Sequence, residues 1–304
     1  MPPLLVRVRR GRWPTTQAAA LVLVATVASI GQCLVISGSQ GADADLWRPL
    51  DVPPHAGDGS GAVVARLLEF LVPLHLRRYQ SVRAAVRSQT NTLVQGRVQA
   101  VHLQGLDWHS RADLTARRLI VTAPDGAALN YLEALAGQLT LTAPTTGWAE
   151  AVFDARDFGN FLKYQPVATT VPRIAGERFL FSSEGVVVDT AARHIVFSGR
   201  WGRRPVKAML EAGPAPGMAL SVCILEAGSS VADASMLGSA LTHFFRNLRV
   251  DLCGVELSFA AMDVRPWHPS ATKRAGSRDG VVPAVWLRLR ATIQRIPNPA
   301  RDRI

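Results

Sequence analysis

Cysteine is scarce in this 304-residue chain, which contains only Cys33, Cys223 and Cys253. None of the three belongs to a CxxC pair or has a neighbouring histidine that would complete a zinc set, so we expect no metal site. Cys223 and Cys253 lie within apolar alternating runs, where a free cysteine usually packs as a small hydrophobic side chain. A disulfide between them, in an exported protein, is the alternative.

The chain also lacks the motifs of common enzyme classes. It contains no G-x-S-x-G nucleophile elbow, no P-loop and no G-x-G-x-x-G followed by a distant acid. Asp107, His109 and Ser110 lie within four residues and suggest a hydrolase. However, a serine adjacent to its own base cannot easily orient for attack. We therefore predict no catalytic residue, no cofactor and no enzymatic activity.

Lysine is rare, and the positive charge is almost entirely arginine. The chain has 34 Lys and Arg against 23 Asp and Glu, yet lysine occurs only at positions 163, 207 and 273. This excess favours an anionic membrane surface or nucleic acid as a partner, and a dispersed arginine-rich surface is the simpler interpretation. Nucleic-acid binding would need a recognition helix or stacking aromatic residues in a basic strip, and the best such strip is Trp286, Arg288 and Arg290 on one strand face. We expect no nucleic-acid partner.

The N-terminal region predicts export or membrane anchoring. Arg7 to Arg12 form a basic cluster that precedes Ala18 to Ile36, an uncharged run of 19 residues. That length lies between a signal-peptide core and a short transmembrane helix, and Ala42-Asp43-Ala44 offers a cleavage pattern. The positive-inside rule then places the body of the protein beyond the membrane. We divide the chain into a signal peptide or anchor (1–44), a flexible tether (45–61), a folded domain (62–297) and a tail (298–304).

Alternating strands dominate the body of the chain. Between Asp251 and Phe259 the odd positions Cys253, Val255, Leu257 and Phe259 are apolar, and so are the odd positions from Val285 to Ile293. Each run therefore predicts a strand with one apolar and one wet face. The even positions, which include Trp286 and Arg288, are expected on the wet face. Shorter alternations around 138–142, 179–181, 206–210 and 218–224 predict further strands. An antiparallel sheet with one covered face is the natural interpretation.

Three amphipathic helices are predicted to cover that sheet. Each shows apolar residues at intervals of three and four. The first runs from Val64 to Leu74, with Pro73 at its end or at a kink. The second follows a capping box at Asp154 and Asp157, and the third follows Asp233 or Ser235 as its cap. The apolar stripes of the second and third helices are Phe158, Phe161 and Leu162, and Leu237, Leu241, Phe244, Phe245 and Leu248.

Four stretches resemble the LmeA-like phospholipid-binding proteins of bacterial envelopes. The sequence LVQGRVQAV at 93–101 resembles the family's first strand, written as leucine, x, x, glycine, basic, valine, and 112–121 is similar to its next strand. AVFDARDFGNFL at 151–162 resembles its strand followed by an Asp-capped helix. The stretch 245–257 resembles the terminal helix and strand of cyanobacterial and plastid members. The resemblance covers about Val63 to Ile296.

The resemblance implies an α+β fold of the tubular lipid-binding type, in which a long curved antiparallel sheet wraps on amphipathic helices. A curved sheet with helices on its apolar face also follows from the periodicities, whereas the lipid follows only from the resemblance. The implied function is binding, and transfer, of phospholipid or another acyl lipid at a cell-envelope or thylakoid membrane. The protein would be membrane-anchored or exported to the periplasm, cell envelope or thylakoid lumen. The alternative is a non-enzymatic envelope structural or adaptor protein that binds a protein partner through Trp286, Arg288 and Arg290.

Two sets of residues follow as candidate sites. The segment from Arg265 to Gly280 is predicted to be a loop, because its prolines and glycines keep it out of the sheet. Exposed tryptophan with basic residues is how peripheral proteins contact anionic headgroups, and a solvated hairpin loop is the alternative. The expected membrane-contact residues are Arg265, Trp267, Lys273, Arg274 and Arg278. The expected lipid groove is lined by Leu241, Phe244, Val255, Leu257, Leu287 and Leu289.

Overall fold

The computed structural model describes residues 59–74, 76–110, 113–128, 140–213, 220–227, 230–251, 255–268 and 280–295. The expected signal peptide or anchor, most of the expected tether, Cys33, Cys253 and the tail lie outside these residues. Within the described ranges, no helix combines the length and the apolar character needed to cross a membrane.

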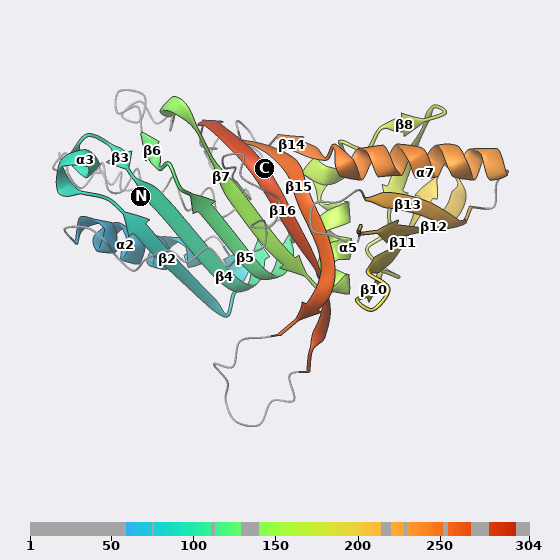
Figure 1. Ribbon diagram of the computed structural model, residues 1–304, viewed down its shortest axis with the longest axis horizontal. Helices are drawn as coiled ribbons and strands as arrows, with labels where there is room; N and C mark the ends of the chain where they lie inside the picture. The colour runs from blue at the N-terminus through green and yellow to red at the C-terminus, as the bar shows by residue number, and fades with distance from the viewer. Residues whose placement is uncertain are drawn as a thin grey trace, which may run out of the picture.

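Antiparallel strands form most of the fold, in two main sheets. The larger sheet has eight strands in the order β1-β4-β5-β7-β16-β15-β14, with β2 also paired to β4. It curls into a half-barrel, and its long β15–β16 hairpin extends beyond the neighbouring strands (Figure 1). The α+β class and the curved antiparallel sheet are therefore confirmed. Its strands are β1 (Leu76–Arg78), β2 (Ser81–Arg87), β4 (Ala100–Ser110), β5 (Thr115–Ala123), β7 (Thr140–Phe153), β14 (Arg249–Asp251), β15 (Val255–Trp267) and β16 (Val282–Arg295).

The smaller sheet has six strands in the order β13-β12-β11-β9-β8, with β10 paired to β11. It lies beside the larger sheet (Figure 1). A separate two-stranded ladder joins β3 (Arg97–Val98) and β6 (Ala127–Ala128). The strands of the smaller sheet are β8 (Arg173–Ile174), β9 (Glu177–Phe181), β10 (Val187–Asp189), β11 (His194–Trp201), β12 (Arg204–Glu211) and β13 (Ser221–Glu226).

The three expected helices are present, and the described residues contain two short helices as well. α2 packs on β2, α5 packs on β5, β7 and β16, and α7 packs on β13. α2 begins at Ser60, so the helix starts inside the segment that we assigned to the tether, and Pro73 lies in its last turn. The helices are α2 (Ser60–Leu74), α3 (Thr90–Val94), α5 (Ala155–Lys163), α6 (Gln165–Ala168) and α7 (Val231–Arg246).

Local signals explain where α5 and α7 begin. The Asp154 carboxylate accepts a hydrogen bond from the Asp157 backbone N–H at 2.8 Å, which confirms the predicted cap of α5. The predicted cap of α7 was wrong. Ser230 holds that position and accepts from the Asp233 N–H at 3.2 Å, so Ser235 lies inside the helix.

The boundaries of two other segments also differ from the prediction. The stretch 93–101 is not one strand: it ends α3, turns at Gly96 with φ 77°, and only then enters β3 and β4. The loop that we predicted from Arg265 to Gly280 begins later than expected. β15 continues to Trp267, because it pairs with β16, which begins at Val282, even across Pro266 and Pro283.

Phenylalanine side chains fill much of the core. One cluster joins the end of β7 to α5 and contains Phe153, Phe158 and Phe161, whose ring centroids lie 5.2–6.3 Å apart. A second cluster lies between the smaller sheet and α7. It contains Phe179, Phe181, Phe197, Phe244 and Phe245.

Candidate functional site

The larger sheet has a continuous apolar face. Leu103, Val121, Ala149, Leu289 and Phe259 pair in register from β4 to β15. The next row is Gly105, Leu119, Ala151, Leu287 and Met262. The predicted apolar alternation is therefore correct for β16 at Leu287 and Leu289 and for β15 at Leu257 and Phe259.

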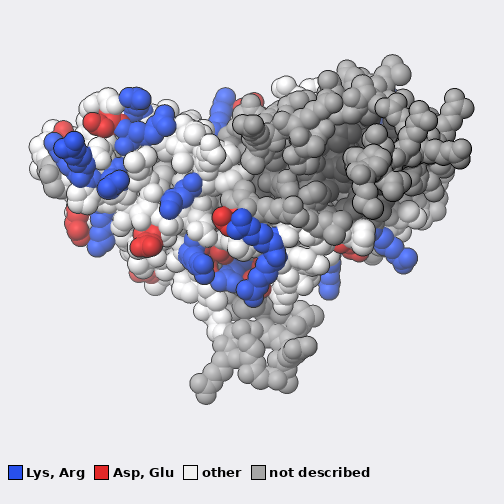
Figure 2. Space-filling view, turned by 180° about the vertical axis from the view of Figure 1, so that it is seen from behind, with Lys and Arg blue, Asp and Glu red and all other residues white. Residues whose placement is uncertain are grey.

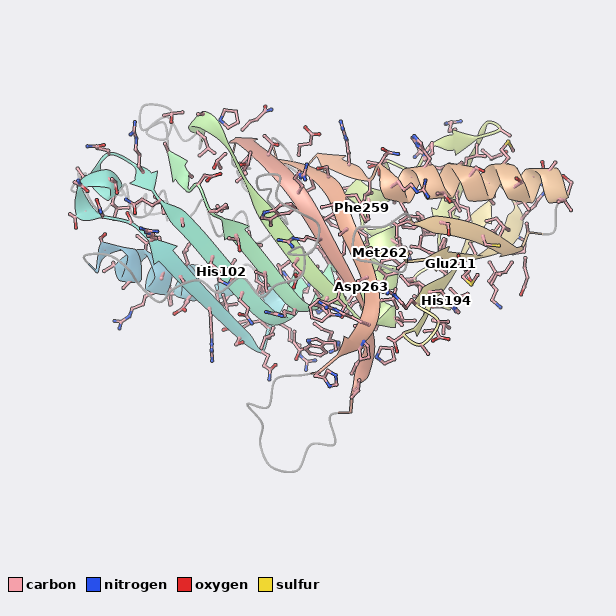
Figure 3. All side chains as sticks on the ribbon, in the orientation of Figure 1. His102, His194, Glu211, Phe259, Met262 and Asp263 are labelled. Atoms are coloured by element: carbon pink, nitrogen blue, oxygen red, sulfur yellow. The ribbon has the colours of Figure 1, made fainter. Side chains whose placement is uncertain are left out.

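A register shift in β15 changes the alternation beyond that point. The shift falls between Phe259 and Ala261, so Met262 and Val264 take over the apolar face at even positions. Phe259, Met262 and Asp263 mark this stretch of β15, with His194 of the smaller sheet nearby (Figure 3). The shift brings Asp263 onto the opposite face, where it meets Arg193.

The expected groove residues are divided between two elements. Leu257, Leu287 and Leu289 lie on the larger sheet and are 2–4% exposed. Val255 begins β15, but its side chain lies outside the described part. Leu241 and Phe244 lie on α7, where the Phe244 ring packs 5.8 Å from that of Phe181. The four leucines and Phe244 nevertheless belong to one continuous core.

A groove of about 720 Å³ lies between α7 and β13, and none of the expected residues lines it. Thr242 and Arg246 hold the helix against the strand, because Thr242 Oγ1 accepts from the Val222 N–H at 2.8 Å and Arg246 Nε donates to the Leu220 carbonyl at 2.7 Å. Cys223 lines the same groove as a free, exposed thiol, so the expectation that it packs inside was wrong. Alternation along β13 buries Val222 and turns Cys223 outward.

The opposite, polar face of the larger sheet contains the main electrostatic feature. Trp286 and Arg288 of β16 are 9% and 6% exposed, which corrects the expectation that they lie on a wet face. The Arg288 guanidinium lies 4.4 Å from the Trp148 ring centre, and that of Arg265 lies 3.9 Å from the Trp286 ring centre. Cation–π stacking of this kind stabilises arginine where water is excluded. Two of the three residues proposed to bind a protein partner are therefore covered.

Glu150 lies among these arginines. It pairs in register with Arg288 across β7 and β16, and Arg118 lies diagonally across on β5. Burial raises the pKa of Glu150, while the nearby charges of Arg118, Arg288 and Arg265 act in the opposite direction. Burial also disfavours the charged form of Arg288 and therefore lowers its pKa.

Two guanidinium N–H groups in this cluster have no acceptor. Arg288 Nη1 and Arg118 Nε are buried and donate to no atom of the described residues. A buried polar group without a hydrogen bond costs about 1–3 kcal/mol, and more when it is charged. The sheet therefore holds positive groups whose hydrogen-bonding capacity is not used by the residues described.

The expected membrane-contact residues are only partly described. Arg265 stacks on Trp286, and Trp267 packs against Val152, Ala284 and Trp286 on the polar face. Both therefore belong to β15 rather than to a loop. Lys273, Arg274 and Arg278 lie outside the described residues.

The residues that suggested a hydrolase have other contacts. Asp107, which has φ 47°, accepts from Arg117 at 3.2 Å. His109 Nε2 lies 3.3 Å from Asp113 Oδ1, and Ser110 Oγ is buried and accepts from the Leu114 N–H at 3.0 Å. These interactions hold the β4–β5 connection together.

Away from the arginine cluster, charge is dispersed over the described part of one face of the molecule. On the face shown in Figure 2, Lys and Arg side chains of the described residues lie in several separate groups, with acidic side chains between them. Within the described ranges, no three His, Cys, Asp or Glu side chains are arranged as a metal site.

Sequence reasoning identified Trp286, Arg288 and Arg290, but it missed Arg118, Trp148 and Glu150. Trp148 and Glu150 lie two residues apart in β7, so their alternation could have placed them on one face. The pairing of β7 with β16 is what brings them to Arg288, and that pairing joins segments far apart in the chain. The chain matches no protein-family model, no curated protein and no solved structure.

Proposed function

We propose that this protein is a non-enzymatic lipid-binding module that holds an acyl chain against the apolar face of its larger sheet, at an anionic membrane surface. The observation that carries the proposal is the apolar face itself, which runs in register across five strands without a polar side chain in either of its two main rows. Four strand spacings of about 4.8 Å make this face about 19 Å wide.

The described helices make their principal contacts near the margins of that face. α2 packs mainly on β2, and α5 lies where β7 ends. Leu257, Leu287 and Leu289 are nevertheless covered, so entry of an acyl chain requires part of the present cover to move aside. Each buried methylene contributes about 0.8 kcal/mol, so ten of them would contribute about 8 kcal/mol toward that displacement.

The resemblance to LmeA-like proteins and the basic composition support the same proposal. The membrane surface would meet the β15–β16 hairpin, whose strands extend beyond their neighbours (Figure 1). Lys273, Arg274 and Arg278 follow β15 in the sequence and would supply charge, at about 1 kcal/mol for each residue near an anionic surface. The proposal extends from binding of lipid to its transfer between membranes.

Lipid bound to the purified full-length protein tests the proposal. Organic extraction and mass spectrometry are expected to find acyl lipid in the wild type and severalfold less in Leu257→Trp, because the larger ring fills space on the apolar face. Leu225→Trp is the control, since Leu225 is 46% exposed on β13. A core substitution can also lower stability, so unfolding of both variants is measured in parallel.

Two results would contradict the proposal. One is a wild-type protein that carries no lipid. The other is equal lipid in wild type and in a folded Leu257→Trp variant. A charged substitution such as Leu289→Asp is unsuitable, because a buried unpaired charge would destabilise the fold whether or not lipid binds.

A further inference from the structure

The polar face of the larger sheet carries an excess of positive charge. The guanidinium cluster consists of Arg118 on β5, Arg265 on β15, and Arg288 and Arg290 on β16. Among the described residues of these rows, two carboxylates face the cluster. Glu150 lies within range of Arg118, Arg288 and Arg265. Asp263 lies at one side, where its Oδ2 is 3.8 Å from Arg265 Nε, and it also accepts from Arg193 at 2.8 Å and from the Val264 N–H.

We propose that the guanidinium cluster binds a phosphate group, either free or as the headgroup of a lipid. Planar guanidinium groups match phosphate oxygens in charge and geometry, and several of them together favour a group that can carry two negative charges. The proposed site lies on the opposite face of the sheet from the proposed acyl site, so neither proposal depends on the other.

The arrangement has the features of a binding site. Arg288 forms the base, since it is 94% buried with its guanidinium stacked on Trp148. The buried Arg288 Nη1 and Arg118 Nε have no acceptor among the described residues, and phosphate oxygens would supply acceptors. The rim is open to solvent at Arg265, whose side chain is 36% exposed, and at Arg290.

Glu150 limits the affinity of this site. Its carboxylate forms no contact ion pair with Arg118 or Arg288 in the described structure, yet it lies within range of both charges. The Glu150 carboxylate would therefore repel a bound phosphate, and it does not serve as a hydrogen-bond acceptor for these two arginines. Replacing it with glutamine removes that repulsion and retains a side chain of the same size. Glu150→Gln should therefore strengthen phosphate binding, whereas the loss of an arginine should weaken it.

Phosphate binding to the full-length protein, measured by calorimetry at constant ionic strength, tests the proposal. We expect Arg118→Gln to weaken binding about tenfold, which equals about 1.4 kcal/mol, and Glu150→Gln to strengthen it severalfold. Arg83→Gln is the matched control, because Arg83 is an exposed arginine on β2 of the same sheet and should leave binding unchanged. Arg118 is only half-buried, so its replacement should leave the fold intact. Denaturant unfolding in a chloride buffer without phosphate verifies that each variant is folded.

Vesicles distinguish the two sources of phosphate. Phosphatidylcholine vesicles containing phosphatidic acid are compared with vesicles containing oleate at equal surface charge. Free phosphate bound in an Arg118-dependent manner supports a soluble ligand, and Arg118-dependent binding to phosphatidic acid alone supports a headgroup. The proposal is wrong if neither is bound, if Arg118→Gln binds like wild type, or if oleate vesicles bind equally well. Lipid extraction reports on the other face, so its outcome does not affect these results.

Discussion

Trp286 and Arg288 illustrate the difference between the direction of a side chain and its exposure. Alternation along β16 correctly places both on the face opposite Leu287 and Leu289. It does not reveal that this face has its own cover, which Trp148 and Trp267 help to build. Large aromatic and arginine side chains bury one another when cross-strand pairing aligns them, and single-strand periodicity contains no information about that alignment.

Glu150 predicts a specific dependence of stability on pH. Burial raises its pKa in the folded protein above the ordinary value of 4.5. The folded state therefore holds this proton more tightly than the unfolded state does, so the contribution of Glu150 to stability is complete below about pH 4.5 and is lost as pH rises through the folded pKa. The charged groups that act on Glu150 are Arg118, Arg288 and Arg265. Burial, together with Arg118, also lowers the pKa of His102.

We expect the unfolding free energy of wild type minus that of Glu150→Gln to decrease as pH rises from 4 to 7. Urea unfolding at several pH values measures this difference, and Glu184→Gln serves as a control at an exposed position. A difference that stays constant or grows with pH would show that the arginines, rather than burial, dominate the Glu150 environment.

At the scale of the secondary structure elements, local signals were predicted better than pairing. The cap of α5 and the apolar stripe of α7 follow from residues close in sequence. The cap at Ser230 was missed because it lies seven positions before Leu237, where the apolar stripe begins. The register shift in β15 and the pairing of β7 with β16 depend on distant segments, and no local motif specifies them.

α5 occupies a position where close approach matters more than helix propensity. A Cβ atom at Gly159 would lie 2.4 Å from the Ser183 carbonyl oxygen, in the segment that follows β9. Alanine normally stabilises a helix interior by about 1 kcal/mol relative to glycine. Overpacking against backbone costs about 1–3 kcal/mol or more. We expect Gly159→Ala to lower the unfolding free energy by about 1–2 kcal/mol in urea.

The control for that substitution is Ser239→Ala on the exposed side of α7, which reports helix propensity without a close contact. It should be neutral or stabilising by about 0.5 kcal/mol. If Gly159→Ala is as stable as wild type, α5 can move away from the Ser183 segment, and the junction between the sheets is looser than the structure indicates.

At the scale of the whole molecule, the two sheets are joined at a small number of places. α5 contacts β9 of the smaller sheet as well as β5, β7 and β16 of the larger one, and β10 contacts β16. The most specific connection is the ion pair between Arg193, in the turn before β11, and Asp263 on β15, at 2.8 Å. Asp263 is 7% exposed, so its carboxylate depends on this partner more than a surface carboxylate would.

A double-mutant cycle with Arg193→Met and Asp263→Asn tests whether this ion pair couples the sheets. We expect a coupling energy of about 1–2 kcal/mol, below that of a fully buried pair because the Arg193 side chain is 32% exposed. The matched control is the exposed pair Lys207 and Glu226, 3.2 Å apart within the smaller sheet, for which about 0.2–1 kcal/mol is expected. Denaturant unfolding of the wild type, the single variants and the double variant supplies the energies. If the effects at Arg193 and Asp263 add to within about 0.5 kcal/mol, the ion pair does not connect the sheets energetically, and α5 is left as their principal junction.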